Sequence, residues 1–142
     1  MKILTSICML GLLMSSLMLT SCGSSDNSGK TPKVSVKNTS WILYQLNGNT
    51  LKSEKDVTIN FSGSDNKVSG SAPCNNYSGT FNSSSGNITF GPLASTKRMC
   101  PEMESETVYL NALQNTSSYK ISGSELNLFD SGGKLLMIFK SK

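Results

Sequence analysis

The chain has 142 residues, of which 37% are hydrophobic, and this length is typical of one domain with a modest core. The formal net charge is +4 and the 13 Lys and Arg residues are scattered, which argues against a nucleic-acid-binding protein. Histidine is absent, so Ser-His-Asp and Cys-His catalysis and histidine-containing zinc sites are excluded, and we expect no cofactor or metal.

The first 22 residues are typical of an exported lipoprotein. Lys2 precedes a long apolar run, and Leu19, two small residues and Cys22 end that run in the manner of a bacterial lipobox. This pattern predicts a signal peptide over residues 1–21 and a lipidated Cys22, palmitate included, that anchors the protein in a membrane. An uncleaved membrane helix is the alternative, because the run approaches bilayer-spanning length. Gly23, the residue after this cysteine, favours location in the outer membrane. The sequence does not indicate whether the domain lies on the periplasmic face or on the cell surface.

The folded domain is expected to begin near residue 40. All ten aromatic residues lie between Trp41 and Phe139, whereas the stretch before them is rich in Ser, Gly, Asn and Lys. We therefore predict a flexible tether over residues 22–39 and a single domain over residues 40–142.

Short β-strands dominate the domain. The segment 57–61 alternates apolar and polar residues, and Gly-rich or Asn-rich turns separate similar segments at spacings of about ten residues. Residues 62–66, 82–86 and 130–134 are the predicted hairpin loops. We expect strands at 41–46, 57–61, 67–71, 76–81, 87–90, 118–121, 126–129 and 135–139. The last of these is apolar on both faces and should be central.

One helix is predicted over about residues 102–114. Pro101 suits a first helical position, and three glutamates in the first turns interact favourably with the helix dipole. The apolar stripe is expected at Met103, Thr107, Leu110 and Leu113, with Tyr109 beside it and the helix ending near Asn115. The elements together predict an α+β fold, mostly β: a curved antiparallel sheet or open barrel of about 7–8 strands with this helix packed on it.

Two motifs about twenty residues apart carry a family resemblance. The first runs from Cys74 to Gly79 (Cys-Asn-Asn-Tyr-Ser-Gly) and the second from Ala94 to Cys100 (Ala-Ser-Thr-Lys-Arg-Met-Cys). With Trp41 and the helix, they make residues 41–140 resemble the META domain family. Pro73, where the family often has Gly, and Lys97 within the second motif are small departures. The resemblance implies a curved, nearly closed sheet with one helix, and a heat-shock or envelope-stress context without established catalytic residues.

Cys74 and Cys100 are expected to form a disulfide. Both remain in the mature domain, and in an exported protein such a pair is more often bonded than free. The bond would stabilise the fold by roughly 3–4 kcal/mol. A pair of buried thiols is the alternative.

A polar group beside these cysteines has two interpretations. Its members are Asn75, Asn76, Ser95, Thr96 and Arg98. Amides and a guanidinium could bind a carboxylate, a phosphate or a glycan hydroxyl. Alternatively, the amides satisfy loop backbone groups and Arg98 pairs with Glu102 or Glu104.

The functional hypothesis is a non-catalytic, monomeric envelope lipoprotein that binds an envelope protein or ligand. No paired carboxylates suited to hydrolysis are evident, because the acidic residues lie in predicted turns or at the helix start. A lipid-anchored inhibitor of lysozyme or of a protease is one alternative, with either the loop 83–87 or the segment 95–98 entering the enzyme's cleft. A small-ligand carrier with the ligand inside the barrel is another.

Overall fold

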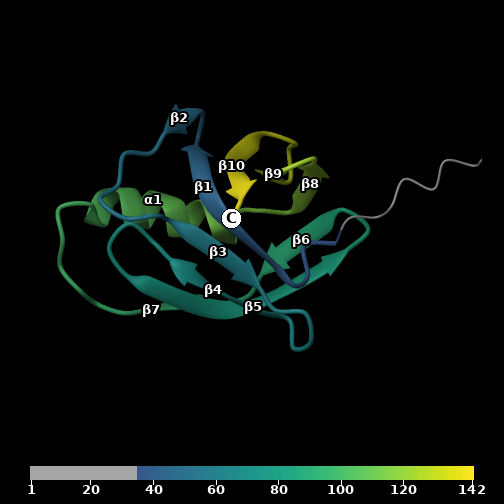
Figure 1. Cartoon of the computed structure of the whole chain (residues 1–142), viewed down its shortest axis with the longest axis horizontal. Coiled ribbons are helices and arrows are strands. Elements are labelled where there is room, and N and C mark those ends of the chain that lie inside the picture. The colour runs from purple at the N-terminus through teal and green to yellow at the C-terminus, as the bar shows by residue number, and fades with distance from the viewer. Residues whose placement is uncertain (1–34) are drawn as a thin grey trace, which may run out of the picture. The chain divides into compact units, whose positions relative to one another are not determined.

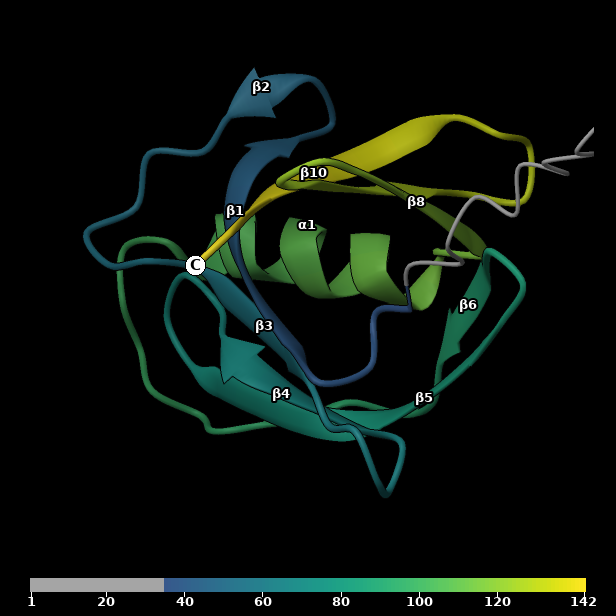
Figure 2. The same cartoon turned by 45° about the vertical axis from the view of Figure 1, so that its right-hand side comes forward.

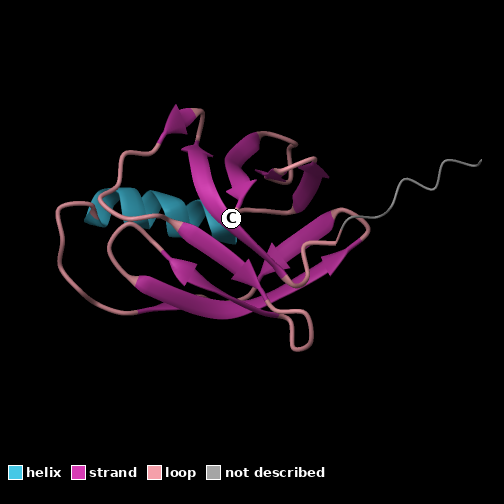
Figure 3. Ribbon diagram, viewed as in Figure 1, coloured by secondary structure: helices cyan, strands magenta, loops and turns pink. Residues whose placement is uncertain are grey.

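A computed structural model describes residues 35–142, which form an antiparallel β-barrel with one helix (Figures 1 and 3). Hydrogen bonds join the strands in the order β10-β9-β8-β6-β5-β4-β3-β1, and β10 also pairs with β1, which closes the barrel. The eight barrel strands are β1 (Thr39–Leu46), β3 (Thr58–Phe61), β4 (Lys67–Ser71), β5 (Asn76–Ser84), β6 (Asn87–Phe90), β8 (Ser118–Ser122), β9 (Glu125–Phe129) and β10 (Leu135–Ser141). The predicted fold class is confirmed, and the barrel is closed rather than open.

The last strand is central, as its apolar sequence predicts. β10 pairs with β9 on one side and with β1 on the other. Leu136, Met137 and Phe139 are buried, and a β-bulge between Leu135 and Met137 allows two successive residues to face the interior.

The hairpin between β5 and β6 differs from its prediction. β5 continues to Ser84, so the turn is only Ser85-Gly86, whereas a loop over residues 82–86 was expected. Both turn residues have positive φ, 52° and 89°, as a two-residue turn that matches the strand twist requires. Two short strands were also missed: β2 (Asn49–Thr50) pairs with β1, and β7 (Ala94–Ser95) pairs with β5.

The helix α1 (Met103–Gln114) lies between β8–β10 on one side and β3–β6 on the other (Figure 2). The helix is where the sequence predicts it, and Asn115 caps its end. Its buried face, however, comprises Glu106, Tyr109, Ala112 and Leu113. The expected stripe is therefore wrong for Thr107, which is exposed, because the helix is rotated so that a glutamate faces inward.

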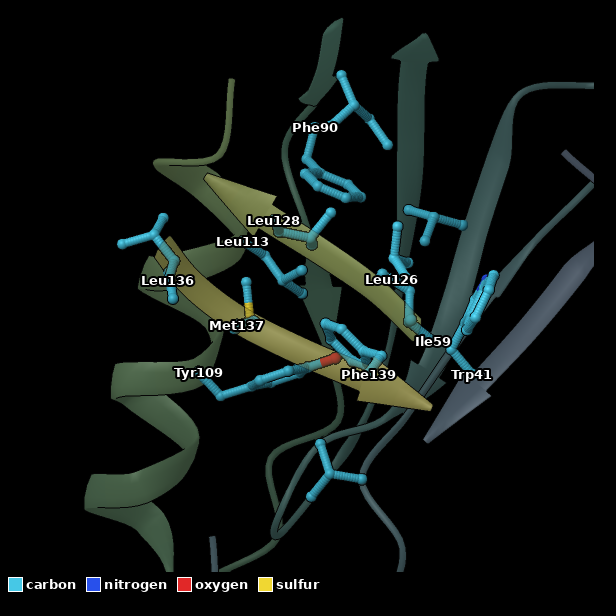
Figure 4. Close-up of a cluster of buried hydrophobic side chains, with 14 of the residues drawn as sticks. Trp41, Ile59, Phe90, Tyr109, Leu113, Leu126, Leu128, Leu136, Met137 and Phe139 are labelled. Atoms are coloured by element: carbon cyan, nitrogen blue, oxygen red, sulfur yellow. The ribbon is translucent and has the colours of Figure 1, made fainter. Parts of the chain in front are cut away.

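Side chains from the strands and the helix fill the barrel interior (Figure 4). Tyr109 of α1 points toward Phe139 of β10, and the ring centroids lie 6.5 Å apart. Val36 is also fully buried, so packing begins shortly before the expected domain start. The interior is thus a packed core, in which burial of each large apolar side chain contributes about 1.5–3 kcal/mol.

The predicted signal peptide, the lipidation site Cys22 and the predicted tether up to residue 34 lie outside the described residues. Within residues 35–142, no helix has the length and hydrophobicity needed to cross a bilayer.

Candidate functional site

The candidate site is the β7–α1 loop, which comprises residues 96–102 and swings out at the left of Figure 1. Its end is tied to the barrel by a disulfide between Cys74 and Cys100, whose Cα atoms lie 5.8 Å apart. The predicted disulfide is therefore formed, and it closes a loop of 26 residues. The two sequence motifs meet at this bond.

Asn75 holds the loop from beneath through its side-chain amide. Its Nδ2 group donates to the carbonyl of Arg98 at 3.2 Å and to Glu106 Oε1 at 2.7 Å. Its Oδ1 atom accepts from the N–H of Arg98 at 2.6 Å and from the hydroxyl of Thr96 at 2.9 Å. Asn75 is only 1% exposed, and these four bonds use both donors and both acceptor sites of the amide. The side chain thus has no capacity left for a ligand.

Glu106 completes this buried network from the helix. Its Oε2 atom accepts the backbone N–H groups of Cys74 and Asn75, at 2.9 and 2.6 Å. The side chain is 4% exposed, and no cation lies within ion-pair distance among the described residues. Three N–H donors therefore compensate for the loss of solvation of the carboxylate.

Three other predicted site residues line the seam between β5 and the loop. The N–H of Thr96 donates to the carbonyl of Asn76 at 3.0 Å, and the Thr96 hydroxyl accepts the N–H of Asn76 at 3.3 Å. Asn76 Oδ1 accepts the hydroxyl of Ser71, and Ser95 pairs with Tyr77 in the sheet. Asn76, Ser95 and Thr96 are exposed, but their bonds join the loop to the barrel.

Arg98 and Met99 differ from these residues, because their side chains point into solvent. Arg98 is exposed, and the expected ion pair with Glu102 or Glu104 is absent: among residues 35–142 the salt bridge joins Lys67 to Asp65. Met99 is 89% exposed, which is unusual for a large apolar side chain. The network therefore fixes the backbone at Arg98 while leaving two adjacent side chains free for contact with a partner.

A hollow of about 400 Å³ adjoins the exposed pair. Its walls carry charges of both signs, from Glu54, Lys55, Arg98 and Glu102, and two prolines. Lys55 Nζ donates to the carbonyl of Cys74 at 3.1 Å, so one of these charges is already engaged. No group of three or more acidic or cysteine side chains able to hold a metal ion occurs in the part of the chain that the structure describes.

Two buried tyrosines form a hydrogen-bonded pair inside the barrel. The hydroxyls of Tyr77 and Tyr109 lie 2.8 Å apart, and Tyr77 donates to the carbonyl of Thr58 at 3.0 Å. Burial raises the pKa of both phenols, and the proximity of Tyr77 raises that of Tyr109 further. Both therefore stay protonated at neutral pH and act as structural donors.

Comparison with known proteins defines the family. The family model described as the META domain matches residues 34–142. The chain belongs to the META domain family. This META chain is 32% identical over 114 residues to the heat shock protein HslJ of Escherichia coli (strain K12), covering 80% of the chain and 76% of HslJ.

Solved structures share the META fold. An NMR structure of a protein from Burkholderia xenovorans has a TM-score of 0.60 and 26% identity, covering 75% of this chain and 83% of that one. A second NMR structure has a TM-score of 0.62 and 24% identity, covering 76% and 95%, and shows likeness of fold alone.

Sequence reasoning missed the roles of Glu106 and Met99 in this META domain. Glu106 was assigned to the helix dipole, although a glutamate three residues before the inward-facing Tyr109 lies on the same helical face. Met99 was not identified as a candidate site residue, because methionine usually fills gaps in a core. No local pattern shows that the disulfide and Asn75 turn it outward.

Proposed function

We propose that this META protein is a non-catalytic, monomeric lipoprotein of the bacterial envelope that binds another envelope component through the β7–α1 loop. The observation that carries the proposal is the contrast within that loop: its backbone is fixed by Asn75 and the disulfide, while Arg98 and Met99 are displayed. Arg and Met are both enriched at protein interfaces, and a loop fixed in advance loses little entropy on binding.

A role under envelope stress is supported by the relationship to HslJ, whose name records heat shock. A non-catalytic role is supported by the buried polar side chains around the two motifs, because they bond to the protein itself. Asn75 uses all four of its hydrogen-bonding positions, and the buried Glu106 accepts three N–H groups, so both side chains serve the fold of the loop.

The anchor is proposed from the sequence around Cys22. A Cys22→Ala variant should be released from membranes and should no longer take up labelled palmitate. If the variant stays in the membrane, the uncleaved helix is correct instead.

Binding can be tested by photo-crosslinking in intact cells, with a photoreactive residue at position 97. A specific crosslinked product should form with Arg98 present and be lost in Arg98→Ala. A matched control is Lys120→Ala, which removes an exposed cation from β8 on a different part of the barrel. If the protein with Arg98 present, the Arg98→Ala variant and the Lys120→Ala variant crosslink equally, the β7–α1 loop is not the binding surface.

The inhibitor alternative is favoured by the backbone of the same loop. The backbone groups of residues 96 and 98 bond to the barrel, whereas those of residues 97 and 99 have no hydrogen-bond partner among residues 35–142. The carrier alternative receives no support from the barrel interior, because buried side chains of β3, β6, β9 and β10 occupy it (Figure 4).

A further inference from the structure

One edge of the β7–α1 loop is bound to the barrel. The N–H of Thr96 donates to Asn76, and both the N–H and the C=O of Arg98 bond to the amide of Asn75. Residues 96 and 98 therefore turn their backbone groups inward. β7 ends at Ser95, and the inward-facing backbone groups of residues 96 and 98 continue its alternation into the loop.

The other edge of the loop is free. In an extended chain the backbone groups of alternate residues point to opposite sides, so those of Lys97 and Met99 face away from the barrel. Among residues 35–142, neither backbone has a hydrogen-bond partner. The loop thus presents N–H and C=O groups at two positions two residues apart, which is the spacing at which an antiparallel strand pairs.

We infer that residues 97–99 form a substrate-like inhibitory segment for a serine protease with an apolar S1 pocket, and that Met99 enters this pocket. Proteases of this class bind a peptide as an added strand and place one side chain in a specificity pocket. The free edge supplies the strand, and Met99, which is 89% exposed, supplies the side chain. This inference rests on the proposed function and deepens it, since the envelope component is then a protease.

The positive charge of residues 97–99 indicates which kind of protease cleft could bind them. Lys97 and Arg98 precede Met99, and both are exposed. The cleft that accepts them should therefore carry acidic groups beside an apolar pocket, because complementary charges speed association and fix register.

The fixed backbone explains why the protease would be inhibited rather than supplied with a substrate. Attack of the protease serine on the Met99 carbonyl forms an ester and breaks the Met99–Cys100 peptide bond, and the proton taken from the serine passes to the new amine of Cys100. That amine stays in place because Cys100 is bonded to Cys74, while the Asn75 amide holds Arg98. The amine can therefore attack the ester, re-form the peptide bond and return the proton, which keeps cleavage slow.

A change of specificity tests the inference. The full-length lipidated protein in mild detergent is assayed against chymotrypsin, subtilisin, trypsin and lysozyme. We expect competitive inhibition of chymotrypsin or subtilisin and none of trypsin. Met99→Lys should inhibit trypsin at least 100-fold more strongly than the unmodified protein does, because the trypsin S1 pocket contains an aspartate. Val108→Lys is the matched control: it places the same side chain at a 40% exposed apolar position on α1 and should change neither inhibition.

The result that overturns the inference is a Met99→Lys protein with an unchanged melting temperature that fails to inhibit trypsin. Rapid cleavage at the Met99–Cys100 bond without inhibition, or inhibition of lysozyme alone, would overturn it as well. If crosslinking in cells still depends on Arg98 while no protease is inhibited, the inhibitor inference fails and the proposed function stands. If the crosslink is also absent, both fail.

Discussion

Replacing Glu106 with Gln should destabilise the domain strongly, although the two side chains have nearly the same size and shape. The carboxylate accepts three N–H groups: those of Cys74 and Asn75 on Oε2, and the Asn75 amide on Oε1. A glutamine presents one oxygen and one NH₂ group. Whichever way it is turned, the NH₂ faces an N–H donor in a region where Glu106 is only 4% exposed.

The magnitude follows from the hydrogen bonds that are lost. In the better orientation the Gln oxygen keeps the two backbone donors, and its NH₂ opposes the Asn75 amide. A hydrogen bond to a charged group contributes about 1.5–3 kcal/mol, and an unsatisfied buried donor costs about 1–3 kcal/mol. Because the lost hydrogen bond and the unsatisfied donor are partly the same effect, we expect the free energy of unfolding to fall by about 2–4 kcal/mol. For a domain of this size that loss lowers Tm by roughly 10–25 °C.

The assay is urea unfolding at pH 7, followed by circular dichroism, with Glu104→Gln as the control. Glu104 is exposed on the same helix, so its change should stay within about 0.5 kcal/mol. If Glu106→Gln lowered the free energy of unfolding as little as the control does, the carboxylate would not be holding the two sequence motifs together. The assignment of Asn75 as a structural residue would then lose its basis.

Three further results are expected. Stability should be full below about pH 10 and fall above it, because the raised pKa values of Tyr77 and Tyr109 keep their protons in the folded state after the unfolded chain has lost them. Denaturant titrations should show a fall of up to about 1.4 kcal/mol per pH unit per tyrosine, and Tyr77→Phe should make the fall shallower, whereas an unchanged slope would contradict the burial. Replacing Cys74 and Cys100 with Ser should cost about 3–4 kcal/mol in chemical unfolding, and a cost below about 1 kcal/mol would mean that the bond adds little to the fold. Gly70→Ala should yield little folded protein on expression, since its methyl group would collide with a β3 carbonyl, and normal expression and melting would show that β3 and β4 can move apart.

Local pattern was sufficient for the barrel strands and the helix, because each strand pairs with a neighbour close in sequence or has an unmistakable alternation. It was insufficient for β2 and β7, whose two residues each carry no periodicity. The rotation of α1 also escaped prediction. The sequence pattern predicts Thr107 on the buried face of the helix and Glu106 in solvent, but Thr107 is exposed and the N–H groups of Cys74 and Asn75 stabilise the glutamate inside. Such a contact joins residues about thirty positions apart and has no local signature.

The polar motif residues were identified from the sequence, but their division into two groups required the structure. Asn75 and Thr96 bond to the barrel and the loop backbone, whereas the side chains of Arg98 and Met99 contribute nothing visible to the fold. Positions 97–99 can therefore change with little effect on stability, while Asn75 and Glu106 cannot. If the proposed binding surface is correct, positions 97–99 of this chain select its partner while the barrel and the disulfide only hold them in place, so the partner is better sought by varying these positions than from similarity of fold.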